Sequence, residues 1–124
     1  MPIKKIINRL SMRFLHRKAI KMSIKTPVVS FTFDDFPSSA MLGAKVLNKY
    51  NKKGTFYVSS GLMNTTFDGI LQFQEKDIEE LILKQHELGC HTYDHLNAKK
   101  VTGCDYENSI LKNRRFMHER FAVE

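Results

Sequence analysis

Residues 28–35 read Val-Val-Ser-Phe-Thr-Phe-Asp-Asp, an apolar stretch rich in β-branched and aromatic side chains that ends at two adjacent carboxylates. This composition predicts a short buried strand, and Pro37 prevents the strand from continuing. Two carboxylates at the end of a buried strand are costly unless a cation, hydrogen bonds or water satisfy them. Asp34 and Asp35 therefore predict a binding site. Successive side chains on a strand point to opposite faces, so Asp34 and Asp35 can act at one site only if the chain turns there. Phe36-Pro37 would supply that turn.

Charge is unevenly placed along the 124 residues, a length that allows one domain at most. The formal net charge is +7, and residues 1–25 hold eight of the twenty Lys and Arg residues and no acidic one. Ile3, Ile7, Leu10 and Phe14 recur at helical spacing in this segment and predict a basic amphipathic leader helix. The helix either docks on its own domain or contacts an anionic membrane surface or partner. Without interleaved aromatic residues it does not indicate nucleic-acid binding.

Location and redox state follow from what the chain lacks. No apolar run approaches the roughly 18 residues of a membrane span, and the leader has no uninterrupted apolar core or cleavage site of a secretory signal. A cytoplasmic location is expected, with a membrane-peripheral one as the alternative. Cys90 and Cys104 are too far apart for a C-x-x-C motif, and we interpret them as reduced thiols.

The rest of the chain alternates between helical and strand patterns. The expected elements are a helix from Ser38 or Ser39 to about Tyr50, a strand at 55–58, a long polar loop at 59–74, a helix from Glu75 through Leu88 that ends at Gly89, a strand at 90–92 and a helix from Asp105 to about Phe121. The apolar sides expected for the first and last of these helices are Ala40 or Met41 with Ala44, Leu47 and Tyr50, and Tyr106 with Ile110, Met117 and Phe121. This alternation predicts an α/β fold with a parallel sheet, which binds ligands at the carboxyl ends of its strands.

Two histidines follow the last predicted strand, at His91 and His95. In an extended strand they would stand about 13 Å apart, whereas a helical turn brings them to about 6 Å, close enough to share a metal ion. A shared ion therefore requires the chain to turn after His91; the alternative is two unrelated histidines. Two imidazoles and one carboxylate are a donor set of catalytic metal sites. His86 and His118 are interpreted as histidines on helix surfaces.

Two motifs in this order resemble the polysaccharide deacetylases with the NodB homology domain, also called carbohydrate esterase family 4. The family's T-F-D-D motif corresponds to residues 32–35, and its H-[ST]-x-x-H motif corresponds to residues 91–95. Residues 53–58 and 85–90 also look like family segments. The resemblance covers about residues 28–97.

The resemblance implies a fold, a site and an activity. The fold would be a partial distorted (β/α) barrel of about three βα units at residues 26–124. Asp35, His91 and His95 would bind one divalent ion, zinc by default with cobalt or another first-row metal also fitting, while Asp34 acts as catalytic base. Thr92 would brace the histidine segment by a hydrogen bond. The reaction would be metal-dependent removal of N-acetyl groups from a glycan or a small amide, by hydrolysis of a carbon–nitrogen bond.

The sequence also departs from the family pattern. Phe36 stands where the family commonly has glycine, and it would crowd the mouth of the site or mark a subgroup. The family's later motifs, among them the histidine that serves as general acid, have no counterpart in these residues. We therefore expect the N-terminal part of a deacetylase that is not competent alone. One alternative is a catalytically inactive metal-binding module.

A further alternative is a structural zinc site. It would use Cys90, His91, His95 and Cys104 as its ligands. This set does not meet the usual zinc-finger spacings, and it leaves the aspartate pair unexplained.

Overall fold

The computed structural model describes Ser23 and residues 25–123. The main sheet consists of the parallel strands β1 (Thr32–Phe33), β2 (Thr55–Val58) and β5 (Glu87–Cys90), in the order β1-β2-β5. The helices are α2 (Ala40–Lys49), α3 (Glu75–Leu83) and α4 (Gly103–Phe121), with a 3₁₀ turn, η1 (Ser60–Leu62). A small antiparallel hairpin joins β3 (Thr66–Phe67) to β4 (Ile70–Leu71). The α/β class and the parallel sheet are as expected from the sequence.

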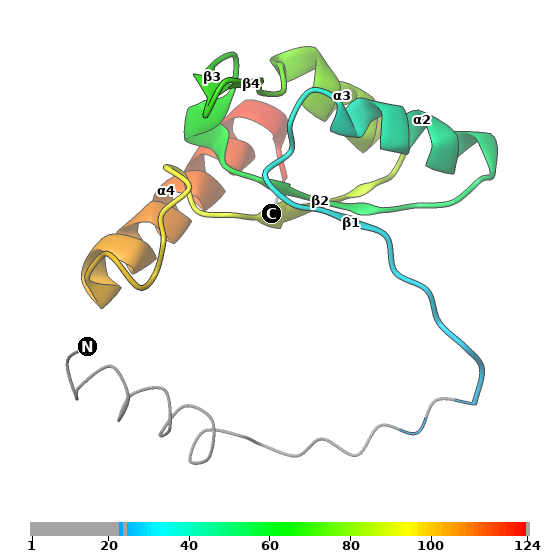
Figure 1. Cartoon of the computed structure of the whole chain (residues 1–124), viewed down its shortest axis with the longest axis horizontal. Coiled ribbons are helices and arrows are strands. Elements are labelled where there is room, and N and C mark those ends of the chain that lie inside the picture. The colour runs from blue at the N-terminus through cyan, green and yellow to red at the C-terminus, as the bar shows by residue number, and fades with distance from the viewer. Residues whose placement is uncertain (1–22, 24, 124) are drawn as a thin grey trace.

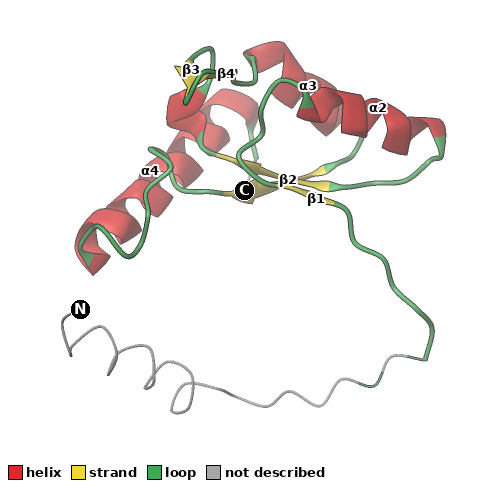
Figure 2. Cartoon of the chain, viewed as in Figure 1, coloured by secondary structure: helices red, strands yellow, loops and turns green. Residues whose placement is uncertain are grey.

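Each crossover between neighbouring strands of the main sheet contains a helix. α2 connects β1 to β2 and α3 connects β2 to β5, and Figure 1 shows both helices on the same side of the sheet. α4 follows β5 and packs against β5 and η1. Figure 2 shows the short strands at the centre, between the helices and the long tail that leads into β1. All three strands run the same way, so the segments after β1 and β5 emerge at one end of the sheet.

The core lies between the sheet and the helices and is rich in phenylalanine. Phe56 of β2 is fully buried, and its ring stacks on that of Phe33 at a centroid distance of 4.4 Å. Phe36 and Phe73 are also buried and stack on each other at 4.7 Å. Helices contribute small and aliphatic side chains: Ala40, Met41 and Ala44 from α2, Ile78 and Leu81 from α3, and Met117 from α4.

The first strand is shorter than the sequence predicts. Val28 and Val29 are 74% and 73% exposed and lie before β1 in an extended segment without strand pairing. The expectation of a buried strand from Val28 is therefore wrong, because β1 is an edge strand that pairs with β2 alone among the described residues. In α2 the predicted stripe is buried except at its end, where Tyr50 is 65% exposed.

The boundary between α3 and β5 also differs from the prediction. The first turn of α3 forms as expected, and the Gln74 backbone N–H donates to the Asp77 carboxylate at 2.7 Å. The helix ends at Leu83, and Gln85 takes the left-handed conformation with φ 59°. Leu88 and Gly89 therefore belong to β5. A glycine is needed at position 89 because a Cβ there would lie 2.6 Å from the ring of Tyr57, and not because a helix ends there.

The predicted polar loop at 59–74 is an ordered connection. It contains η1 and the β3–β4 hairpin, and Gln72 and Phe73 near its end are buried. Asp68 and Gly69 form the hairpin turn, both with positive φ, as a two-residue Asp-Gly turn requires. Backbone pairing of Ser38 with Leu71 ties the hairpin to the chain just after β1.

α4 buries only part of the face that was expected: Met117 is buried and Phe121 packs against the core, whereas Ile110 does not take part. The buried residues are Ser109, Asn113 and Met117, spaced four apart, whereas Ile110 is 37% exposed. The helix uses polar side chains here because it packs on backbone groups as well as on the core. The Asn113 side chain donates to Val58 O and accepts from Ser60 N. Hydropathy alone could not select this face.

Within the part of the chain that the structure describes, no helix is long and apolar enough to cross a membrane. The predicted leader helix falls almost wholly on residues 1–22 and 24, outside the described residues.

Candidate metal centre

Three side chains meet beyond the carboxyl ends of β1 and β5. Oδ1 of Asp35 lies 3.0 Å from Nε2 of His91 and 2.8 Å from Nε2 of His95. The two imidazole centroids are 5.1 Å apart. The side chains are partly open to solvent, with exposures of 54% for Asp35, 36% for His91 and 27% for His95. The structure thus brings together the three residues that the sequence singled out as ligands.

A sharp turn after β1 directs Asp35 into this group. Asp35 and Phe36 both have positive φ, 61° and 37°, so the extended backbone stops and reverses there. Asp34 lies exposed directly before the turn, and no hydrogen bond from the described residues reaches its carboxylate. The Phe36 side chain points into the core rather than into the site, with no exposed surface. The expectation that it crowds the mouth of the site is wrong.

The histidine segment turns after His91, as a shared ion would require. His91 N–H donates to Val58 O at 3.0 Å, and Ser59 Oγ donates to His91 O at 2.7 Å. Thr92 then takes a φ of 62°, and its Oγ1 accepts a hydrogen bond from Leu96 N at 2.8 Å. Thr92 is 3% exposed, so this contact is shielded from water. The turn directs both imidazoles to the same side as Asp35.

The donor set fits a divalent cation. Ligand atoms held 2.0–2.2 Å from one tetrahedral ion lie about 3.3–3.6 Å from one another. Candidate ligand atoms of Asp35, His91 and His95 all lie within 4.8 Å of each other, and the N···O separations given above are shorter than that spacing, so a small outward shift of the side chains would admit the ion. Three protein donors leave coordination positions open, the arrangement of catalytic rather than structural zinc.

The cysteines take no part in this group. Cys90 and Cys104 are free and exposed. The Cys90 sulfur accepts from Asn113 Nδ2 at 3.3 Å, and that of Cys104 accepts from Asn108 Nδ2 at 3.5 Å. The structure therefore does not assemble the zinc set with two cysteines and two histidines.

An aromatic wall that sequence reasoning missed borders the histidines. The Phe67 ring meets the His95 imidazole edge-on at a centroid distance of 5.2 Å, and the Tyr57 ring lies 6.1 Å from that of His91. Phe67 comes from β3 of the hairpin that is tied to the chain after Asp35. The Asp68-Gly69 pair was the available sequence signal, because this dipeptide favours two-residue hairpins.

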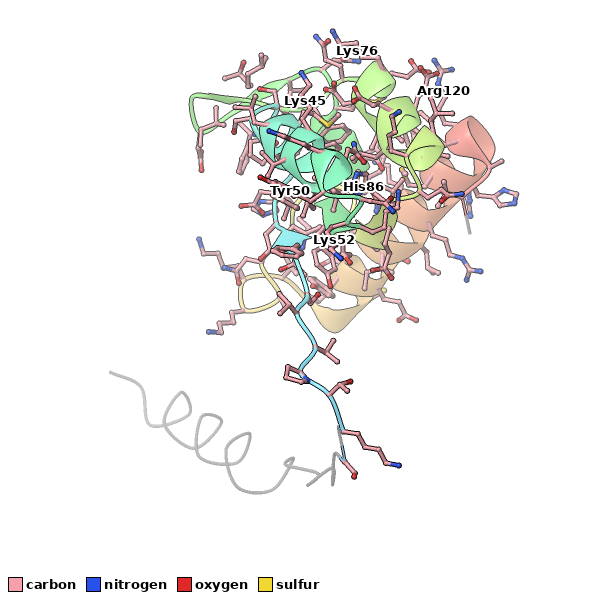
Figure 3. All side chains as sticks on the ribbon, turned by 90° about the vertical axis from the view of Figure 1, so that its right-hand side faces the viewer. Lys45, Tyr50, Lys52, Lys76, His86 and Arg120 are labelled. Atoms are coloured by element: carbon pink, nitrogen blue, oxygen red, sulfur yellow. The ribbon has the colours of Figure 1, made fainter. Side chains whose placement is uncertain are left out.

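His86 is not on a helix surface, contrary to the prediction. It is 7% exposed and lies between α3 and β5, at the opposite end of the strands from the candidate metal centre. Its Nδ1 accepts from Gly54 N at 3.1 Å, and its Nε2 lies 3.1 Å from Asn48 Oδ1. Burial, followed by the charge of Lys53, holds the pKa of His86 below its usual value. Figure 3 views the molecule from the end that carries His86.

His118 matches its prediction and is exposed on α4.

The fold and the site together define an α/β protein with a candidate metal centre at the carboxyl ends of its parallel strands. A sequence model of the polysaccharide deacetylase family matches residues 21–123, and the chain belongs to that family.

Curated relatives carry deacetylase names. The chain is 33% identical over 84 residues to a bifunctional xylanase/deacetylase of Pseudobutyrivibrio xylanivorans, a match covering 67% of this chain and 13% of that protein. It is 28% identical over 119 residues to a peptidoglycan-N-acetylglucosamine deacetylase of Listeria monocytogenes, covering 86% of this chain and 23% of that protein. A Bacillus cereus protein of the same name is 31% identical over 93 residues, covering 73% of this chain and 30% of that protein.

Two solved structures share the fold. IcaB from Ammonifex degensii superposes with a TM-score of 0.72 at 20% identity, over 83% of this chain and 49% of that one. The Streptococcus pyogenes deacetylase PplD, solved in complex with acetate, gives a TM-score of 0.67 at 18% identity, over 98% of this chain and 50% of that one. The chain thus spans about half of these two structures and less than a third of the curated relatives described above.

Proposed function

We propose that this protein is a metal-dependent hydrolase that removes N-acetyl groups from a carbohydrate. The observation that carries the proposal is the convergence of Asp35, His91 and His95, with Asp34 adjacent, in a chain of the polysaccharide deacetylase family. The names of its relatives favour an N-acetylated glycan as substrate, with peptidoglycan the commonest among them. A small amide fits the same chemistry.

Asp35, His91 and His95 would hold one divalent ion, with zinc the default for two imidazoles and a carboxylate. Cobalt or another first-row metal fits the same donors. When bound, such an ion polarises the acetamide carbonyl and acidifies a coordinated water. Coordination requires neutral imidazoles, so acid should release the ion.

Asp34 would take the proton of the attacking water. A general base must come within hydrogen-bond reach of that water, and Asp34 is an exposed carboxylate directly next to a proposed ligand. Thr92 would keep the histidine segment turned through its bond to Leu96 N, because loss of that turn would separate the imidazoles.

The leaving amine needs a proton donor, and the described residues offer no clear one. His91 and His95 belong to the metal group, His86 is buried at the other end of the strands, and His118 is exposed on α4. We propose that the general acid comes from polypeptide outside these 124 residues, because the family's later motifs have no counterpart in them. General acid help is typically worth about 10² to 10⁴-fold in rate, so these 124 residues alone would bind metal with little turnover.

The test is acetate release from N-acetylglucosamine oligomers by zinc-loaded protein, first as the 124-residue chain and then with the C-terminal half of a related deacetylase added or fused. Turnover should require that half, and it should fall strongly in Asp34→Asn. Failure of every combination would favour the metal-binding module. Zinc-dependent release by the 124 residues alone, abolished by Asp34→Asn, would contradict the proposed source of the general acid.

A further inference from the structure

The middle of the histidine segment is attached to α4 by Ser109. Ser109 Oγ accepts from the backbone N–H of Tyr93 at 2.9 Å and of Asp94 at 3.3 Å, and it lies 3.3 Å from the Asp94 carboxylate, to which it donates. The Ser109 backbone carbonyl also accepts from Tyr93 N at 3.1 Å. Ser109 is 3% exposed, so water does not compete for these bonds. One side chain thus holds two successive peptide groups between the two imidazoles.

The segment between His91 and His95 also contacts η1 and a second residue of α4. Tyr93 O accepts from the backbone N–H of Gly61 at 2.9 Å, on the side of the segment that faces η1. One helical turn beyond Ser109, the Lys112 ammonium lies 3.7 Å from the centroid of the Tyr93 ring and 4.0 Å from Asp94 Oδ1. The peptide between His91 and His95 is therefore fixed by side chains and backbone outside the metal group.

This attachment bears on the metal group because the segment has no regular structure of its own to hold it. Thr92 and His95 both have positive φ, 62° and 53°, a conformation that disfavours side chains with a Cβ. Such a backbone persists only where its surroundings over-determine it. Released from α4, the segment would relax towards extended conformations, in which residues four apart separate beyond the reach of one ion.

We propose that Ser109 is a positioning residue for the metal centre: through the Tyr93 and Asp94 amides, α4 sets the separation of the two imidazoles before the ion arrives. The inference rests on the proposed function, since it assumes that His91 and His95 bind metal. Hydrogen-bond partners outside the ligand set typically change metal affinity by about 10 to 100-fold. Ser109 acts through the peptide rather than on an imidazole, so Ser109→Ala should weaken zinc binding by about tenfold, the lower end of that range.

The test compares zinc affinity by isothermal titration in wild type, Ser109→Ala, Ser109→Thr and a matched control, Ser60→Ala. Ser60 is also a buried serine, 4% exposed, but its hydroxyl has no partner in the described part of the chain. Ser109→Ala should bind about tenfold more weakly, Ser109→Thr should recover most of the affinity by restoring the hydroxyl, and Ser60→Ala should match wild type. The ligand-field spectrum of bound cobalt should change in Ser109→Ala alone.

The outcomes separate this inference from the proposed function. Wild type that binds no zinc would overturn both. Equal affinity and an unchanged cobalt spectrum in wild type and Ser109→Ala would overturn the positioning role and leave the metal centre standing. Lys112→Met, a change at an exposed side chain, covers the case in which Ser109→Ala does not fold: we expect affinity about threefold weaker, the size of one exposed cation–π contact, and no change would overturn the proposal.

Discussion

Replacing Phe36 by alanine and by glycine would test both its burial and its backbone conformation. The side chain has no exposed surface, stacks on Phe73 at 4.7 Å and meets the edge of Phe56 at 5.5 Å. Truncating a buried phenylalanine to alanine typically costs about 3–5 kcal/mol, through lost transfer free energy and the cavity left behind. We expect Phe36→Ala to lower the free energy of unfolding by that amount.

Phe36→Gly should be less damaging than Phe36→Ala, although it removes one more carbon. The φ of 37° is unfavourable for any residue with a Cβ, at a cost of roughly 1–3 kcal/mol. Glycine avoids that cost, but its unfolded chain has more conformational freedom, which lowers the free energy of unfolding by about 0.4–1 kcal/mol. The difference leaves Phe36→Gly about 1 kcal/mol more stable than Phe36→Ala.

The assay is urea unfolding of the metal-free protein followed by far-ultraviolet circular dichroism. Both variants should retain the wild-type dependence on urea, so that shifts of the midpoint report stability. A loss below about 1.5 kcal/mol in Phe36→Ala would refute the buried, stacked ring, because a core phenylalanine costs at least twice that. A glycine variant less stable than the alanine variant would refute the left-handed conformation at this position.

Three further predictions concern other parts of the chain. Because the folded state depresses the pKa of His86, it holds fewer protons than the unfolded state, and the free energy of unfolding should fall as pH drops below about 6.5. That fall should be shallower in His86→Gln; an equal slope in wild type and His86→Gln would contradict the buried histidine. Gly61→Ala, whose Cβ would lie 2.7 Å from a backbone oxygen of the histidine segment, should weaken zinc binding, whereas Gly103→Ala, with nothing within 4 Å, should not. If the leader at residues 1–25 contacts anionic membranes, the alternative to docking on its own domain, vesicle sedimentation should detect weak binding that high salt and deletion of the leader both abolish.

The sequence predicted the elements whose pattern is dictated by local chemistry. Phe56 and Val58 of β2 are buried in the alternation that a strand imposes. The first turn of α3 is acidic, which suits the start of a helix. The convergence of Asp35 with His91 was also predictable, because parallel strands bring their carboxyl ends to one edge. These features depend on neighbours in sequence or on the direction of the strands.

The features that the sequence did not reveal depend on contacts between distant segments. His86 resembles a helix-surface residue until Gly54 and Asn48, more than thirty positions away in sequence, are placed against it. The buried face of α4 is set by backbone groups that Ser109 and Asn113 satisfy, and hydropathy does not register those groups.

The central claim is that one divalent ion binds to Asp35, His91 and His95, and a zinc titration near pH 7.5 tests it most directly. Wild type should bind about one ion, and binding should weaken in acid, because coordination requires neutral imidazoles. The His91→Ala, His95→Ala double variant should lose binding, while the Cys90→Ser, Cys104→Ser double variant should bind as wild type does. Undiminished binding by the histidine variant, or loss of binding in the cysteine variant, would contradict the account.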